Sequence, residues 1–207
     1  MTTVTTTLPM FPLGAVLLPG AFLPLHVFEE RYREMFARLR ASDDGGFGIL
    51  WAAEEGLRDV GCRCTIDHVL QEHDDGRLDV LTCGGTPMRV AGELTHVPYP
   101  AAPVVLLDDD AEADDPSARA AAEQAYDMLV AAVTGQPPDP GALAGMGAYA
   151  MAATIELGLE VKQELLELRS ERARLRLLQR VLAETLEQLG PGELAQARAR
   201  SNGTIRF

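Results

Sequence analysis

The chain has 207 residues and a formal net charge of −13, and its basic side chains are 17 arginines and one lysine, Lys162. This length is enough for one large domain or two small ones, each with a buried core. Hydrophobic residues make up 47% and charged residues 24%, a composition that excludes global disorder. Because Lys162 lies in Glu-Val-Lys-Gln, the chain contains no Walker-type phosphate-binding loop.

The few cysteines and the lack of long apolar segments favour the cytoplasm as the compartment of this protein. Three cysteines, Cys62, Cys64 and Cys83, are too few for a disulfide framework. Residues 1–7 carry no positive charge and no apolar run, so they do not resemble a secretory signal. The longest uncharged stretch, residues 140–155, is shorter than the ~20 apolar residues of a membrane span. These features predict a cytoplasmic protein with reduced thiols and no membrane association.

The amino-terminal half predicts a small β-barrel or sandwich, because short apolar runs recur between turn signals. Asp75-Gly76 is the strongest hairpin signal. Prolines at positions 9, 12, 19 and 24 favour edge strands or interrupted pairing, which would leave backbone groups free at a sheet edge. The predicted strands cover residues 8–13, 16–18, 22–27, 47–51, 62–70, 78–82, 88–90 and 103–107.

One helix is predicted within this β-rich half, from Glu29 to Arg40. Its apolar residues recur at the helical spacing i, i+3, i+4 and i+7, which places them on one face. They are Tyr32, Met35, Phe36 and Leu39.

An acidic segment separates the two halves of the chain. Residues 108–116 hold six acids and no base, whereas residues 1–107 have a net charge of −6 and residues 117–207 a net charge of −1. The segment has no apolar periodicity and ends at Pro116, which is typical of a solvated loop. We therefore predict a β-rich domain at 1–107, an acidic linker at 108–116 and a helical bundle with a tail at 117–207.

The residues after this linker predict helices only. Ser117 is placed to cap a helix that ends at Gly135, and Ser170 to cap the longest helix, 171–189. Shorter helices are predicted at 142–157 and 161–168, and the tail from Glu193 is predicted to start as a helix. The longest helix carries an apolar stripe of Leu175, Leu178, Leu182, Leu186 and Leu189.

The block from Leu8 to Arg33 is the most informative part of the sequence. It contains Leu-Pro-Met-Phe-Pro-Leu-Gly-Ala-Val-Leu-Leu-Pro-Gly and then Leu-Pro-Leu-His-Val-Phe-Glu-Glu-Arg-Tyr. This block resembles the amino-terminal substrate-binding domain of Lon proteases, and more closely the stand-alone relatives of that domain. The resemblance continues through Phe47-Gly48-Ile49, Asp75-Gly76-Arg77 and residues 162–167. It implies an α+β protein, with a PUA-like β-barrel domain followed by an α-helical bundle.

The resemblance also implies a non-catalytic module that binds apolar or unfolded polypeptide segments and contributes to protein quality control. The ATPase and Ser-Lys protease modules of full-length Lon are missing, and Lys162 with Ser170 has no glycine-rich oxyanion motif nearby. We therefore expect no enzymatic activity and no cofactor. The predicted peptide-binding residues lie at the second strand and the helix start, with one on the neighbouring loop: Leu13, Phe28, Glu29, Arg31 and Tyr32. The alternative is that Phe28 and Tyr32 only pack the helix onto the barrel.

Two further side-chain groups have more than one interpretation. Cys62 and Cys64 on one strand would share a face, and with Cys83 and His68 or His73 they could bind zinc, although core packing is the favoured interpretation. His26 is interpreted as a hydrogen-bonded structural residue.

The four arginines 169, 172, 176 and 180 share one face of the last long helix. They predict a solvated face paired with Glu171, Glu184 or Glu187, or a docking surface for an acidic partner or for residues 108–115. Two alternative functions follow, an adaptor that docks a protease or other assembly through the helical domain and a barrel that binds a small ligand. Nucleic acid is not an expected partner, because the β-rich half is acidic. The oligomeric state is left open.

Overall fold

The computed structural model describes residues 5–42, 44–96, 98–136 and 145–189, and the chain divides into two compact units. The first unit, called the barrel unit here, comprises Met1–Asp108 and Leu157–Arg169. The second, called the helical unit, comprises Asp109–Glu156 and Ser170–Phe207. The described elements are β1 (Thr5–Leu13), β2 (Phe22–Val27), α1 (Glu30–Arg40), β3 (Phe47–Ala53), β4 (Gly56–Glu72), β5 (Leu78–Val90), β6 (Ala101–Leu106), α2 (Pro116–Thr134), α3 (Ala148–Ala153), α4 (Leu159–Glu167) and α5 (Glu171–Gln188).

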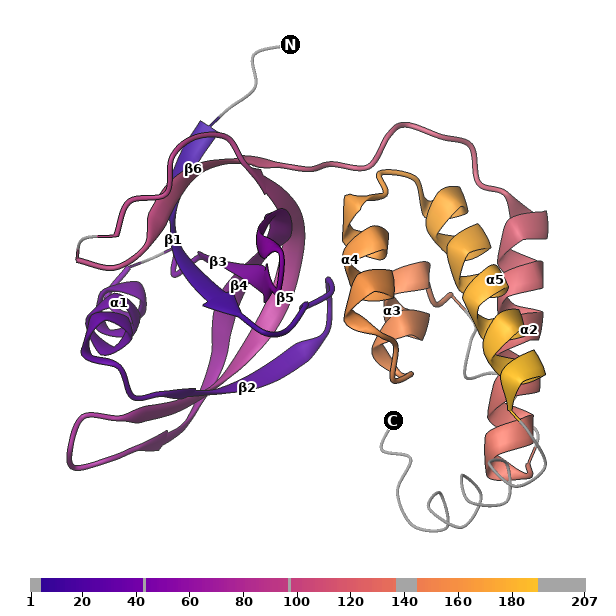
Figure 1. Ribbon diagram of the computed structural model, residues 1–207, viewed down its shortest axis with the longest axis horizontal. Coiled ribbons are helices and arrows are strands. Elements are labelled where there is room, and N and C mark those ends of the chain that lie inside the picture. Colours follow the sequence, from indigo (N-terminus) through magenta and orange to yellow (C-terminus); the bar gives the residue numbers. More distant parts are fainter. Residues whose placement is uncertain (1–4, 43, 97, 137–144, 190–207) are drawn as a thin grey trace. The chain divides into compact units, whose positions relative to one another are not determined.

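The strands of the barrel unit form one sheet that closes on itself (Figure 1). The strand order is β2-β5-β4-β3-β1-β6, and a further pairing of β5 with β6 completes the barrel. The two ends of β5 have different neighbours, because β2 pairs with residues 78–83 and β6 with residues 88–90. Thus β1, β3, β4, β5 and β6 make the closed barrel, and β2 is an added strand outside it. The predicted barrel and the α+β fold class are confirmed.

The prolines mark where strand pairing is incomplete, as predicted. Residues 5–9 of β1 pair with β6, and residues 10–13 pair with β3, so Pro9 and Pro12 lie in a strand that changes partner along its length. Pro24 lies in β2, which pairs with β5 alone among the described strands. Proline has no backbone N–H to donate, and it is tolerated at such positions because no second neighbouring strand requires that hydrogen bond.

Residues 16–18 were predicted as a strand but form none, although all three are buried. The chain instead crosses β5 closely at Gly84. The Gly20 amide donates to the Gly84 carbonyl at 2.8 Å, and the Gly84 amide donates to the Ala21 carbonyl at 2.9 Å. A Cβ atom on Gly84 would lie 2.2 Å from the Leu18 carbonyl oxygen, so this crossing requires glycine.

The β4–β5 hairpin is much longer than predicted, at 17 and 13 residues. The prediction covered residues 62–70 of β4 and missed both ends, where residues 56–59 and 71–72 are all exposed and lack the alternation of buried and exposed residues by which strands are recognised. The turn itself is where Asp75-Gly76 predicts it. Gly76 has φ of 82°, and the His73 amide donates to the Arg77 carbonyl at 2.9 Å.

Two hydrophobic clusters fill the barrel unit. One of them includes α1 and contains its four predicted apolar residues, Tyr32, Met35, Phe36 and Leu39, all buried. The other takes residues from β1, β3, β5 and β6: Leu8, Met10, Leu50, Met88, Ala102 and Val104. The predicted helix face is therefore the face that joins α1 to the sheet.

The observed units differ from the predicted domain boundaries at two points. Helix α4 was expected within the helical bundle, but it groups with the barrel unit because it packs on β4. Buried Gln163 of α4 donates from Nε2 to the Val60 carbonyl at 3.1 Å. The acidic residues from Asp109 onward group with the helical unit, whose arginines they pair with.

The described helices of the helical unit are α2, α3 and α5. Helix α2 begins two residues earlier than predicted, because Asp115 rather than Ser117 is the capping residue and accepts a hydrogen bond from the Ala118 amide at 3.1 Å. Its end at left-handed Gly135 is confirmed, as is the Ser170 cap of α5, which accepts from the Ala173 amide at 3.1 Å. The helix predicted at 142–157 is observed only as α3, and residues 137–144 lie outside the described residues. The predicted tail from Glu193 also lies outside them.

Candidate functional site

Two of the predicted peptide-binding residues belong to the barrel core. Tyr32 is 6% exposed, and its ring meets Phe11 edge-to-face with centroids 4.4 Å apart. Burial raises the pKa of the Tyr32 hydroxyl, an effect that the nearby Arg31 charge partly offsets. Leu13 is half-buried and packs against the same cluster. Tyr32 therefore fixes α1 to the sheet, the alternative role considered for it.

The other predicted residues lie at the surface where β2 leads into α1. The Arg31 guanidinium pairs with the Glu29 carboxylate at 2.9 Å and lies 4.6 Å from the Tyr32 ring centroid. Phe28 is 61% exposed, and its ring stacks on His26 at 5.9 Å. The alternative role of packing α1 onto the barrel therefore does not apply to Phe28, which leaves most of its apolar surface in solvent.

Strand β2 presents a row of alternate side chains on its outer face. Phe22, Pro24 and His26 are exposed, whereas Leu25 and Val27 between and beyond them are buried. Strand periodicity continues the row to Phe28, directly after the strand. The row lies on a strand edge that has no second neighbour among the described strands.

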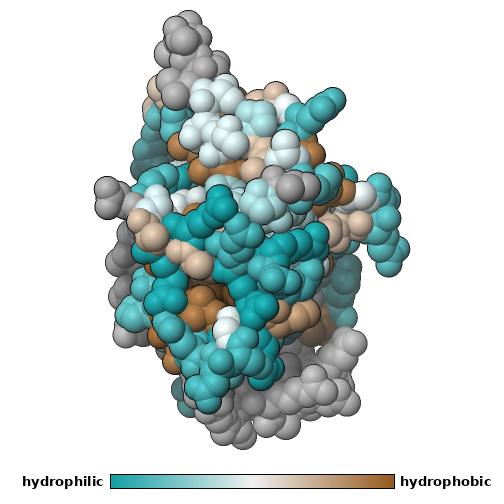
Figure 2. All heavy atoms as spheres, turned by 90° about the vertical axis from the view of Figure 1, so that its left-hand side faces the viewer, coloured by the Kyte–Doolittle hydropathy of each residue, from teal (hydrophilic) through white to brown (hydrophobic). Residues whose placement is uncertain are grey.

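A groove adjoins this row on the outer side of the hairpin. It has a volume of about 340 Å³. Leu70 on β4 is 57% exposed, as is Phe22 on β2, so large apolar side chains are accessible at both strands. Figure 2 views the barrel unit from the side of α1 and shows hydrophobic side chains in hollows between hydrophilic ones. The groove is lined by Pro24, Leu25, His26, Leu70, Gln71 and Asp79.

Two histidines converge on one carboxylate at this groove. The Nδ1 atom of His26 lies 2.5 Å from Oδ1 of Asp79, and Nε2 of His73 lies 2.7 Å from Oδ2. Because a carboxylate only accepts hydrogen bonds, both ring nitrogens donate. These bonds, first that of His26 and then that of His73, lower the pKa of Asp79. The prediction that His26 is hydrogen-bonded is correct, but its partner was not foreseen.

The cysteines do not form the zinc site that was considered. Cys62 and Cys64 share a face as predicted, but both are fully buried in the hydrophobic cluster around α1. Hydrogen bonding with Cys62, together with burial, raises the pKa of the Cys64 thiol far above its usual range, so this thiol stays protonated. In the described part of the chain, His73 groups with His26 and Asp79 rather than with any cysteine. Core packing is therefore the role of Cys62 and Cys64.

The arginine face of α5 is engaged by the acidic segment. Arg172 pairs with Glu112 at 3.4 Å and Arg176 with Asp115 at 3.4 Å, instead of with glutamates of their own helix. Arg169 donates to the Asp108 carbonyl at 2.7 Å. For Arg169, Arg172 and Arg176, partners are therefore observed in residues 108–115 of the same chain.

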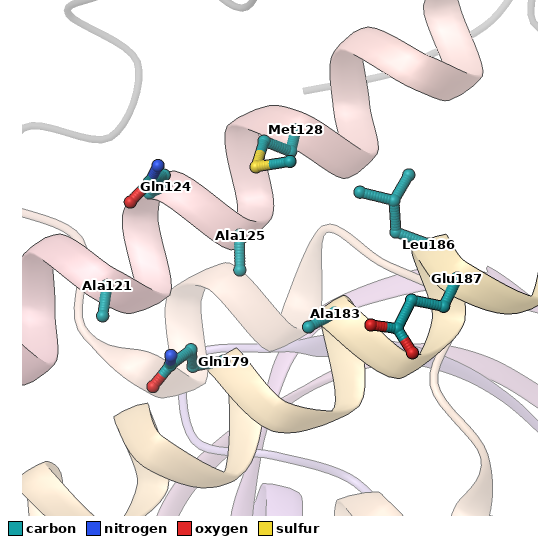
Figure 3. A pocket seen from close by; sticks show the side chains of 8 residues that line it. All are labelled: Ala121, Gln124, Ala125, Met128, Gln179, Ala183, Leu186 and Glu187. Atoms are coloured by element: carbon teal, nitrogen blue, oxygen red, sulfur yellow. The ribbon is translucent and has the colours of Figure 1, made fainter.

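The helical unit has an apolar groove of its own, between α2 and α5 (Figure 3). Its volume is about 360 Å³. Met128, with 52% of its surface exposed, stands on one wall and Leu186 on the other. Small residues, Ala121, Ala125 and Ala183, keep the floor of the groove open.

The fold places the protein in the class of small closed β-barrels that have an added edge strand and a covering helix. The barrel unit is linked in sequence to a helical unit. A model of the family described as the ATP-dependent protease La (LON) substrate-binding domain matches residues 7–184. The chain belongs to this family. No helix among the described residues is long and apolar enough to cross a membrane.

Solved structures agree with this assignment. A Lon N-terminal domain protein from Xanthomonas campestris is 25% identical, with a TM-score of 0.63 over 86% of this chain and 98% of that one. The N-terminal domain of the Mycobacterium avium complex Lon protease is 21% identical, with a TM-score of 0.61 over 88% of this chain and 99% of that one. This second likeness shows the fold alone.

Proposed function

We propose that the barrel unit binds extended polypeptide segments that expose apolar side chains, as in unfolded proteins. The family is described as the substrate-binding domain of an ATP-dependent protease, and proteolytic substrates are polypeptides. The observation that carries the proposal is the exposed apolar row of β2, which lies on a strand edge beside a groove.

Strand addition is the binding mode that fits this edge. An extended peptide that pairs with β2 would form main-chain hydrogen bonds whatever its sequence. Every second side chain of the peptide would lie on the same face as the apolar row and beside it. Phe22, Phe28 and Leu70 are each more than half exposed. Fully covering one such side chain contributes up to about 2 kcal/mol, so a few contacts suffice for measurable affinity. The binding is therefore sequence-tolerant but selective for apolar segments.

The roles of the predicted site residues follow from their burial. In this proposal Phe28 contacts the bound segment, and the Glu29–Arg31 ion pair lies at the polar rim. Tyr32 and Leu13 support the site from the core. Replacing Tyr32 is consequently a poor test, because its loss would disturb the barrel itself.

Fluorescence anisotropy with a labelled, permanently unfolded polypeptide tests the proposal at two salt concentrations. We expect saturable binding that changes little with salt. The triple variant Phe22→Ser, Phe28→Ser, Leu70→Ser should bind at least about tenfold more weakly, since tenfold is only 1.4 kcal/mol. The matched control is Leu57→Ser, which removes an apolar side chain 42% exposed elsewhere on β4. Unchanged affinity in the triple variant, or an equal loss in the control, would contradict the proposal.

Docking of a protein partner through the helical unit stays a second prediction, favoured by the groove that Met128 lines. The arginine face is a weaker candidate, because an acidic partner would have to displace Glu112 and Asp115. A partner that uses the groove loses binding in Met128→Lys and keeps it in the triple barrel variant. The small-ligand alternative also stays a prediction, for which ligand-dependent thermal shifts are the test.

A further inference from the structure

His26, His73 and Asp79 form a compact group of metal-ligating side chains. One ligand atom of each residue lies within 4.8 Å of a ligand atom of the other two. Among the described residues, no other three histidine, cysteine, aspartate or glutamate side chains come this close together. The residues come from β2, the hairpin turn and β5. Two imidazole nitrogens and one carboxylate oxygen are a donor set that suits zinc and other first-row transition metals.

The surroundings hold these three residues in place. His26 and Asp79 are directly opposite in the β2–β5 ladder, so their side chains share a face. His73 precedes the hairpin turn, which α1 anchors: Arg33 donates to the Asp75 carbonyl at 2.7 Å, and Arg40 pairs with Glu72 at 2.6 Å. The two imidazole rings already stand edge-to-face, with centroids 5.8 Å apart. The group is therefore positioned by three elements rather than by one flexible loop.

We propose that His26, His73 and Asp79 bind one divalent first-row transition metal ion, Zn²⁺ being the first candidate. Metal–ligand bonds of about 2.1 Å require ligand atoms roughly 3.4 Å apart in a tetrahedral site. Small side-chain rotations bring atoms within 4.8 Å to that spacing. On binding, the coordinating nitrogen of each imidazole gives up the proton that it donates to Asp79, and the neutral ring then carries its proton on the other nitrogen, by exchange with solvent. Coordination replaces the two hydrogen bonds to Asp79.

Three protein ligands leave a fourth coordination position open. His26 and Asp79 also line the groove on the outer side of the hairpin, so this position would be close to the proposed polypeptide site. The metal would link β2 to the hairpin tip and stiffen the edge at which strand addition is proposed. Metal binding itself does not depend on the proposed function, because it needs only the three side chains.

Isothermal titration of the full chain with Zn²⁺, after treatment with a chelator, tests the site. We expect one ion per chain, and Co²⁺ should give the visible absorption bands of a low-coordinate site. His73→Gln and Asp79→Asn should each weaken binding at least about tenfold, because even losing a residue that only supports a ligand has effects of this size. A circular dichroism spectrum of each variant verifies its fold.

The matched control is the double variant His68→Gln, His96→Gln, which removes the other two of the four histidines. His68 lies on the same hairpin and contacts the Asp67 carboxylate, so it forms a histidine–aspartate pair with a single histidine. The control should retain full affinity. Absence of stoichiometric binding to the unaltered chain, or equal affinity in a folded His73→Gln variant, would overturn the proposal. Polypeptide binding measured with and without Zn²⁺ is a separate readout, so either proposal can fail alone.

Discussion

Each unit gathers hydrogen-bond donors around carboxylates, but the two clusters differ in burial. In the helical unit, Arg174 is 2% exposed and donates to Asp109 at 2.8 Å and to Glu171 at 3.1 Å. In the barrel unit, Asp79 accepts from two histidines at the edge of an accessible groove. A buried cation must be fully satisfied to be tolerated, whereas an accessible cluster can exchange its hydrogen bonds for a ligand. Similar polar chemistry is therefore structural in one unit and available for binding in the other.

The Arg174 cluster also joins several elements of the helical unit. Its guanidinium carbon lies 4.4 Å from the Tyr149 ring centroid, and Glu171 accepts from the Ala148 amide at the start of α3 at 2.7 Å. Burial by itself would lower the pKa of Arg174, but the hydrogen bond and charge of Asp109, the electrostatic effect of Tyr149 and the hydrogen bond of Glu171 more than offset it and raise the pKa. Arg174 thus remains charged and ties the acidic segment to α5 and α3.

The largest effect is expected from Arg174→Ala. The substitution removes a buried side chain and leaves Asp109 and Glu171 without their shared cation, so we expect a loss of about 2–4 kcal/mol. Urea denaturation followed by far-ultraviolet circular dichroism measures this loss. Arg176→Ala is the matched control, because Arg176 is 64% exposed and its ion pair should contribute less than about 1 kcal/mol. Similar losses in both variants would mean that the buried ion pairs of Arg174 contribute no more than an exposed ion pair of the same helix.

An intermediate effect is expected from the pH dependence of the α2 cap. Hydrogen bonds from Ser117 and the Ala118 amide, with the Arg176 charge, lower the pKa of Asp115. A lowered folded-state pKa stabilises the protein above the unfolded pKa of about 4, and this contribution disappears as the pH falls through the folded-state value.

Asp115→Asn separates this charge from the cap itself, because asparagine also caps helices well. The difference in melting temperature between the original protein and this variant should be constant above pH 5 and shrink towards pH 2. Thermal unfolding monitored by circular dichroism at each pH gives the comparison. A difference that grows in acid would mean that the Asp115 charge is unfavourable in the folded state.

The smallest effect on stability is expected at the accessible cluster. His73→Gln should change the free energy of unfolding by less than about 0.5 kcal/mol, because the residue is partly exposed and glutamine can still donate to Asp79. Urea denaturation without metal measures it. A loss as large as that of Arg174→Ala would show that the cluster is primarily structural, and the contrast between the two units would not hold.

Local sequence signals predicted most elements of the fold. The helical spacing from Tyr32 to Leu39, the hairpin at Asp75-Gly76 and the caps at Gly135 and Ser170 all depend on residues close together in the chain, and all are observed. The ends of β4 were missed because residues 56–59 and 71–72 are all exposed and show no hydrophobic alternation. Strand β5 was predicted as two pieces because Gly84, Gly85 and Pro87, which are typical of turns, lie between them. The assignment of α4 to the barrel unit depends on its packing on β4 and could not be read from its own helical pattern.

The candidate site shows the same division between local and distant information. Phe28 and Tyr32 were predicted together as binding residues, and the sequence did not show that Phe28 is exposed whereas Tyr32, four residues further, is buried. The groove was not predicted, because it needs the register of β2 on β5 and of β5 on β4. Strand register depends on hydrophobic patterns and turn geometry in both partner strands, so it cannot be read from a single strand.

By itself the sequence determined the family, the α+β class and the position of most elements, because motifs, caps and periodicity act over a few residues. Only the tertiary structure decided that His26 meets Asp79, 53 residues away, and that Arg174 is buried against Asp109, 65 residues away. Such contacts depend on strand register and on helix packing, which many distant residues fix together. For the same reason the sequence did not single out Arg174 as a buried residue, and it did not bring His26 and His73 together as a candidate metal site.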